Sequence, residues 1–196
     1  MDIVSTVAGL VAGVGVVAAT TVLVGLVATL VVPGFRVWPP GDDDGLRRAY
    51  LVCSRTFFVC FLVAGGVGFG GVSVPAAVRV AGGVLAAVAF VTLTRADLGE
   101  ENTRGRAEGL VTGGTYHYSR NPQVVGFVGL FVGYALATAA PTAGVLAVLG
   151  VAWMLLSVFV EEPWLREQYG DAYEAYRRSV PRFVGIRTVR RWLGTD

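Results

Sequence analysis

The chain has 196 residues, of which 54% are hydrophobic and 15% are charged, and its mean hydropathy is +0.63. Soluble domains contain about a quarter charged residues and lack apolar runs near twenty residues long. These values exclude a soluble domain and predict an integral membrane protein. The net charge of +2 is too small to indicate a nucleic-acid partner, and we expect none.

Five apolar stretches predict transmembrane helices, because about 20 apolar residues are needed to cross the hydrocarbon core. The stretches are residues 3–32, 49–71, 74–94, 124–140 and 142–160. The first is too long for a signal peptide and lacks the basic start of one. Little more than Pro141 separates the last two, which predicts a tight helical hairpin. We expect an all-α membrane protein with three N-terminal helices in residues 1–94 and a second part in residues 95–196.

Charged residues predict the orientation in the membrane. Fourteen of the sixteen positive residues, all arginines, follow the first, third or fifth stretch. The positive-inside rule places those segments in the cytoplasm and the N-terminus outside. The exceptions, Arg55 and Arg79, are expected to snorkel to the interface, unless Arg55 faces a polar cavity. We expect the third loop and the C-terminal helix to form a cytoplasmic cap, and the tail from Gly185 to lie on anionic lipid.

Two further patterns do not predict a metal site, a disulfide or a nucleotide-binding site. His117 is the single histidine, and Cys53 and Cys60 lie about 10 Å apart along one helix, so we expect no metal site and no disulfide. Residues 66–71 fit the dinucleotide-binding fingerprint, but they end an apolar stretch without a strand–turn–helix context. Close helix packing explains those glycines better, and glycine pairs in two stretches predict it also, Gly9/Gly13 and Gly129/Gly133.

The segment 110–126 has residues suited to an anion. Gly113 and Gly114 permit an unusual turn, and the Asn121-Pro122 pair starts a helix whose first turn presents free N–H groups. Arg120 adds a guanidinium that can pair with a carboxylate or phosphate. The alternative is a topological arginine beside interfacial tyrosines.

Glu161 and Glu162 directly follow an apolar run. Carboxylates at a helix exit are costly unless they face water, a cation or hydrogen-bond donors. The pair therefore predicts a site for an ammonium group or for ribose hydroxyls, or else it marks a charged helix exit.

The sequence after the acidic pair predicts a second helical segment. Asp171 and Glu174 resemble a capping box, so we expect a helix to restart there and to end before Pro181. Four aromatic residues recur near helical spacing, which indicates packing, an interfacial anchor or a ligand cage: Trp164, Tyr169, Tyr173 and Tyr176.

In this order, the motifs resemble those of the integral-membrane methyltransferases typified by isoprenylcysteine carboxyl methyltransferase and phosphatidylethanolamine N-methyltransferase. The matching motifs are Gly114-Thr115-Tyr116, Arg120-Asn121-Pro122 with Gly126, the helical hairpin, Glu161-Glu162, Tyr169-Gly170 with Tyr173 and Tyr176, and Val180-Pro181-Arg182-Phe183. The resemblance covers residues 98–184. Residues 1–94 share only apolar spans with the family.

The resemblance implies methyl transfer from S-adenosylmethionine, with S-adenosylhomocysteine as product, to a lipid-like or hydrophobic acceptor at the cytoplasmic face. It implies Arg120 and Glu162 as catalytic residues. It also implies a cofactor-binding set: Gly114, Tyr116, Tyr118, Arg120, Asn121, Pro122, Gly126, Glu161, Glu162 and Tyr173. Arg120 and the helix start suit the cofactor carboxylate, the acidic pair suits its ammonium or ribose, and the tyrosines suit adenine or sulfonium.

Further alternatives remain open. Asn121 replaces the histidine common in prenylcysteine enzymes, which leaves the acceptor undefined, and His117 is a candidate base for an amine acceptor. A membrane sterol or enone reductase that uses NADPH has similar C-terminal motifs. A non-catalytic membrane subunit would bind no small molecule. The sequence does not predict an oligomeric state.

Overall fold

The computed structural model describes residues 3–39, 43–96 and 109–194, and within these ranges every regular element is a helix. In chain order the elements are α1 (Ile3–Val31), α2 (Asp44–Val67), α3 (Ala76–Arg95), the 3₁₀ helix η1 (Gly114–His117), α5 (Pro122–Thr138), α6 (Pro141–Ser179) and α7 (Ile186–Leu193). Arg104 and Arg106, in the predicted third loop, lie outside the described residues.

The predicted all-α membrane architecture is confirmed. Among the described residues, four helices are long and apolar enough to cross a membrane, namely α1, α2, α3 and α6, while the apolar α5 is shorter at 17 residues. The expected hairpin is also present, because α5 ends at Thr138 and α6 begins at Pro141. The largest extensions beyond the predicted stretches are at the start of α2 and at the end of α6. Asp43 caps α2 through Oδ1, which accepts from the N–H groups of Gly45 and Leu46 and so adds a polar first turn.

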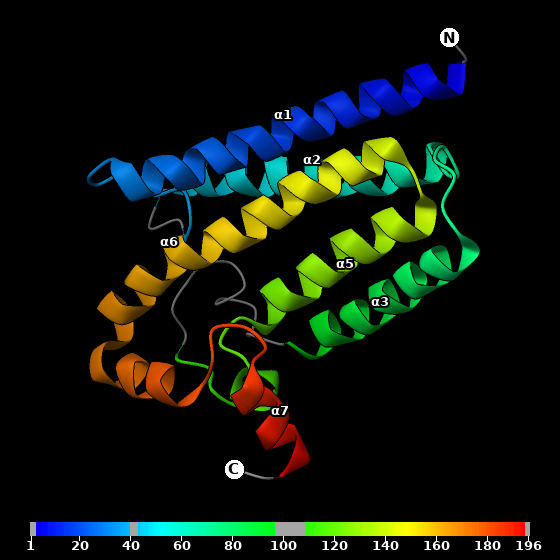
Figure 1. Ribbon diagram of the computed structural model, residues 1–196. Helices are drawn as coiled ribbons and strands as arrows, with labels where there is room; N and C mark the ends of the chain where they lie inside the picture. The colour runs from blue at the N-terminus through cyan, green and yellow to red at the C-terminus, as the bar shows by residue number, and fades with distance from the viewer. Residues whose placement is uncertain (1–2, 40–42, 97–108, 195–196) are drawn as a thin grey trace.

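The helices pack in a continuous series. Figure 1 shows α1 lying across α2 and α6, with α5 beside α6 and α3 beside α5. Glycine allows α3 and α5 to approach closely, since a Cβ at Gly133 would lie 2.5 Å from the backbone nitrogen of Ala86. The expected contact at Gly129 and Gly133 is therefore confirmed. At Gly9 and Gly13 no atom lies within 4 Å of an added Cβ, so the predicted contact there is wrong.

Buried aromatic rings fill the centre of the bundle. Phe57 of α2 packs edge-on against Phe131 of α5, with centroids 5.7 Å apart, and against Trp153 of α6, with centroids 5.5 Å apart. All three side chains are almost fully buried. This core fixes α2, α5 and α6 relative to one another, and these are the helices that supply the walls of the site described below.

The two ends of the bundle differ. At one end, the loop after α2 is bonded to the α5–α6 turn, since Gly70 N donates to Thr138 O at 2.8 Å and Val72 N to Ala139 O at 3.0 Å. Arg79 lies at this end, where its Nε donates to Ala137 O at 3.2 Å. The opposite end carries the loop after α1, η1 and α7 (Figure 1).

A kink divides α6. Gly170 has φ 48° and ψ −126°, a conformation that side chains strongly disfavour, and the chain turns back there before the helical segment that ends at Ser179. The predicted helix restart at Asp171 and the end before Pro181 are confirmed. Glu174 does not act as a capping residue, because its oxygens accept from Arg166 at 2.7 Å and from Arg177 at 3.1 Å.

Candidate active site

A cavity of about 280 Å³ lies where α2, α5 and α6 meet the segments at the α7 end of the bundle. Its size is near the lower limit of small-molecule sites in proteins. Polar side chains occupy part of the wall, and the remainder is mostly aromatic or aliphatic. The polar lining residues are Ser54, Arg120, Asn121, Gln123, Ser157 and Glu161, and the aromatic ones are Trp38, Tyr50, Phe58, Tyr116, Phe127, Trp153, Trp164, Tyr169, Tyr173 and Tyr176.

The aromatic wall is built by contacts between elements far apart in sequence. Trp38, after α1, stacks on Tyr50 of α2 with ring centroids 4.6 Å apart and an interplanar angle of 18°. Tyr50 in turn meets Trp153 of α6 edge-on at 5.9 Å. Ring faces held in this way suit a flat heterocycle or a cation.

Backbone pairing fixes the entrance to α5. The N–H of Arg120 donates to Pro181 O at 2.9 Å, and Asn121 Nδ2 donates to Arg182 O at 2.9 Å. Pro122 then starts α5 at a position where its missing N–H costs nothing. The segment before α5 and the segment after α6 are thereby joined, and this places Arg120 beside the second half of α6.

Arg120 is the charged group at the centre of the site, and its side chain is only 8% exposed. Nη1 lies 3.2 Å from Glu162 Oε1 and donates to the hydroxyl of Tyr173 at 3.3 Å. Its Nε is buried without a hydrogen-bond partner. Buried donors are almost always satisfied in proteins, so this one indicates a group that the protein itself does not supply.

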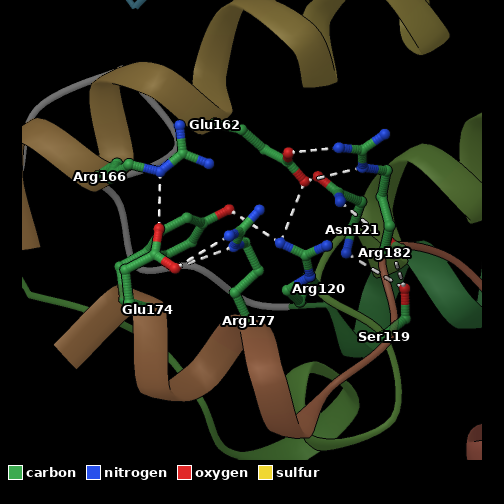
Figure 2. A network of polar contacts seen from close by, with 9 residues as sticks. Ser119, Arg120, Asn121, Glu162, Arg166, Glu174, Arg177 and Arg182 are labelled. Atoms are coloured by element: carbon green, nitrogen blue, oxygen red, sulfur yellow. Dashed lines mark hydrogen bonds and ion pairs between the residues drawn. The ribbon is translucent and has the colours of Figure 1, made fainter. Parts of the chain in front are cut away.

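Glu162 forms an ion pair with Arg120 but does not line the cavity. Arg182 donates to it through two nitrogens, from Nε to Oε1 at 2.9 Å and from Nη2 to Oε2 at 2.6 Å. Figure 2 shows the carboxylate of Glu162 between the two guanidinium groups. This carboxylate raises the pKa of Arg182 above its usual value. Glu162 is 5% exposed and is not among the lining residues.

Glu161, by contrast, lines the cavity. Its Oε1 accepts a hydrogen bond from the indole N–H of Trp38. The two adjacent acidic residues therefore have different surroundings, because successive positions on a helix point in directions about 100° apart.

The other predicted cofactor-binding residues are divided between the cavity wall and its support. Tyr116 and Tyr173 line the cavity, and both are buried. Neither Gly114, which has φ +59°, nor the exposed Tyr118 is among the residues that line the cavity. Gly126 contacts α3, where an added Cβ would lie 2.7 Å from Leu93 Cγ.

Pro122 is buried at the first position of α5.

Two residues whose participation the sequence left open, Arg55 and His117, are exposed and do not line the cavity.

Several residues in the site were missed by the sequence analysis. Trp38, Tyr50 and Trp153 lie in or beside apolar stretches, where aromatic residues carry no functional signal of their own. Arg182 was present in the Val180-Pro181-Arg182-Phe183 motif, but nothing in its local sequence paired it with an acidic residue twenty positions earlier. Among the described residues no cluster of histidine, cysteine or acidic side chains could hold a metal ion.

The residues present fit the groups of S-adenosylmethionine. The buried guanidinium of Arg120, whose Nε lacks a partner, suits its carboxylate, the carboxylate of Glu161 suits its ammonium, and the aromatic wall suits adenine. This fit concerns chemical type and implies no particular pose.

Comparison with known proteins identifies the family. The sequence profile of the phospholipid methyltransferases matches residues 77–172, just under half of the chain. The matched segment begins at the second residue of α3 and ends two residues after the kink at Gly170, so it contains Arg120, Glu161 and Glu162. A search of curated proteins and a search of solved structures each gave no match. Residues 77–172 are therefore a phospholipid methyltransferase domain, of the family of membrane methyltransferases that includes the phosphatidylethanolamine and isoprenylcysteine enzymes.

Proposed function

We propose that this protein transfers a methyl group from S-adenosylmethionine to a lipid-like acceptor at the cytoplasmic face of the membrane. The observation that carries the proposal is the partly polar cavity in which Arg120 and Glu161 lie among aromatic rings. Family membership supports methyl transfer, and the cavity supports a ligand that has both an anionic and a cationic group.

Arg120 is proposed to bind the carboxylate of the ligand. Its buried Nε has no partner, and the side chain is already held on one side by Glu162 and Tyr173. Glu161 is proposed to bind the ammonium group, and Tyr116 and Tyr173 to enclose the remainder. Of the two residues predicted to be catalytic, Arg120 borders the cavity, and Glu162 holds Arg120 in place through their ion pair.

S-adenosylmethionine supplies an activated methyl group on a sulfonium leaving group. The chain therefore has little covalent chemistry to perform. Its residues bind the ligand, orient it and exclude water, so that rate enhancement comes mainly from proximity and electrostatics. The apolar part of the wall, which includes Phe58, Phe127 and Met154, suits the chain of a membrane-dissolved acceptor.

The cytoplasmic placement rests on charge. The arginine-rich segments follow α1, α3 and the apolar part of α6, and the cavity lies at the end where those helices emerge. By the positive-inside rule this end faces the cytoplasm. A water-soluble cofactor would enter there, and the acceptor would arrive from the bilayer.

The test is calorimetric binding of S-adenosylhomocysteine to the full chain in detergent, with NADPH measured in parallel. We expect saturable S-adenosylhomocysteine binding and none of NADPH. Arg120→Lys keeps the charge but loses the fork of donors, so it should weaken binding about tenfold, while Arg177→Lys on the exposed surface should not. Folded protein that binds NADPH instead, or neither ligand, overturns the proposal.

A second measurement tests methyl transfer. Membranes that contain the protein are incubated with S-adenosylmethionine labelled in its methyl group, and the label is followed into the lipid extract. We expect incorporation above that of membranes with the Arg120→Lys variant. Label that stays wholly in the aqueous fraction contradicts a lipid-like acceptor.

A further inference from the structure

We propose that Glu162 and Arg182 are positioning residues that act on the ligand through Arg120, and that Glu161 is the acidic residue that contacts the ligand. This inference rests on the proposed function. It divides the adjacent acidic pair into one structural and one ligand-binding carboxylate.

Both carboxylate oxygens of Glu162 are already occupied. Oε1 accepts from Arg182 Nε and also lies 3.2 Å from Arg120 Nη1, while Oε2 accepts from Arg182 Nη2. The Glu162 side chain is 7% exposed and does not line the cavity. To contact a ligand directly, it would have to give up charge-assisted hydrogen bonds, which are about twice as strong as neutral ones.

The charges of this cluster do not cancel. Arg120 and Arg182 carry two positive charges, and Glu162 supplies one negative charge between them. The Glu162 ion pair with Arg182 is the closer one, at 2.6 Å and 2.9 Å, against 3.2 Å for Arg120. The surplus positive charge therefore belongs mainly to Arg120, the member of the cluster that lines the cavity and has an unpartnered donor.

Arg182 is itself fixed from two directions. Its carbonyl oxygen accepts from Asn121 Nδ2 at 2.9 Å, and its guanidinium lies 5.1 Å from the ring centroid of Phe159. Arg182 therefore links the segment before α5 to α6 and holds Glu162 in one orientation (Figure 2). If Arg182 is removed, Glu162 becomes available to neutralise Arg120 completely, and the attraction for an anionic group falls.

Glu161 has the opposite arrangement. It borders the cavity, and a neutral indole N–H from Trp38 is its hydrogen-bond donor. Among the ion pairs of the described residues, none joins Glu161 to an arginine. The Glu161 carboxyl group is thus not committed to another charged residue and can accept a hydrogen bond from an ammonium group of a ligand.

The two roles can be separated by changing the ligand rather than only the protein. Three probes are used: S-adenosylhomocysteine, an analogue that lacks its amino-acid carboxylate, and an analogue that lacks its amino group. Each is titrated calorimetrically into the wild-type chain and into Glu161→Gln, Glu162→Gln, Arg182→Met, Arg182→Lys and the control Arg177→Met. Unfolding midpoints without ligand are measured for every variant.

For Arg182→Met, we expect S-adenosylhomocysteine affinity to fall about tenfold, as for coupled charges in one network. Affinity for the analogue without the carboxylate should change less than about twofold, because its missing group is the one that Arg120 binds. Glu162→Gln should follow the same ligand dependence, since it releases Arg120 from its position. Arg182→Lys should recover part of the loss.

For Glu161→Gln, we expect the converse. Affinity for S-adenosylhomocysteine should fall about tenfold, while affinity for the analogue without the amino group should stay within about twofold of wild type. Because each variant is compared with itself across three ligands, a general loss of stability does not imitate this pattern. If Arg182→Met does not fold, the same comparison is made with Arg182→Lys.

The inference is overturned if Glu162→Gln loses affinity only for ligands that carry the amino group, because Glu162 would then contact the ammonium directly. It is also overturned if Arg182 variants lose affinity equally for all three probes. Failure of the proposed function looks different, since the wild-type chain would then bind none of the probes.

Discussion

The indole N–H of Trp38 donates to the carboxylate of Glu161 and so ties the loop after α1 to the middle of α6 across 123 positions of sequence. The stacking of Trp38 on Tyr50 brings α2 into the same contact. Trp38 and Tyr50, which precede the matched segment, therefore contribute to the surroundings of a carboxylate that lies within it.

Trp38→Phe tests this contact. The substitution keeps a ring for stacking on Tyr50 but removes the donor to Glu161. We expect S-adenosylhomocysteine affinity to fall about three- to tenfold, the usual effect of one hydrogen bond to a charged group. Calorimetry on the purified variant measures it. Tyr118→Phe, at an exposed ring outside the cavity, is the control, and an equal loss in both variants contradicts the role of Trp38.

The close contact of α3 with α5 predicts a stability difference between glycines. Gly133→Ala introduces a methyl group whose carbon would lie 2.5 Å from a backbone nitrogen of α3, so the helices must separate. We expect a loss of about 1–3 kcal/mol, as for overpacked cores, seen as a lower unfolding midpoint in detergent.

Gly13→Ala is the matched control for that experiment. No atom lies within 4 Å of the added carbon at Gly13, and alanine is the better helix former. The midpoint of this variant should stay level or rise. A drop comparable to that of Gly133→Ala would show that the α1 surface is packed against something.

Gly170→Ala tests the kink in α6. An alanine at φ 48° and ψ −126° carries a backbone penalty of about 1–3 kcal/mol. The segment that bears Tyr173 should shift to relieve it, so both the unfolding midpoint and S-adenosylhomocysteine affinity should decrease. Gly144→Ala in the first turn of α6, which has open space around it, should change neither. Unchanged ligand affinity in Gly170→Ala would mean that the kink does not position the tyrosine.

His117→Gln tests the hypothesis that the single histidine is a catalytic base. The imidazole is exposed and lies outside the cavity wall. Exposed substitutions usually change free energies by no more than about 0.5 kcal/mol, so we expect methyl transfer and ligand affinity within about twofold of wild type. A loss of transfer with intact binding, confined to pH values near neutrality, would restore His117 as a candidate base.

Hydropathy predicted the membrane helices well, because the length of an apolar run directly measures whether a segment can cross the bilayer. It missed the first turn of α2, which depends on a polar cap at Asp43. The spacing of small residues predicted a close helix contact at Gly9 and Gly13, where no neighbouring atom lies within 4 Å of an added Cβ. Spacing of small residues permits close packing, but it does not say which face a neighbour will cover.

The candidate site could be predicted only in part. Arg120 and Glu161 stood out because charged residues at a membrane boundary need a partner. Glu161 and Glu162 are identical and adjacent in the sequence, so the sequence does not predict that their surroundings differ. The difference comes from Trp38 and Arg182, which contact Glu161 and Glu162 respectively from distant segments of the chain. The residues next to the acidic pair in the sequence do not indicate which distant side chains will contact it.

The pairing of Arg120 and Asn121 with Pro181 and Arg182 also sets an order of events during synthesis. All the apolar helices, through the membrane part of α6, precede residues 181–182 in the chain. A nascent chain can therefore insert its whole bundle into the bilayer while the entrance to α5 still lacks its backbone partners. We therefore expect the candidate site to be completed last, after residues 181–182 have left the ribosome and docked against a bundle that is already in the membrane.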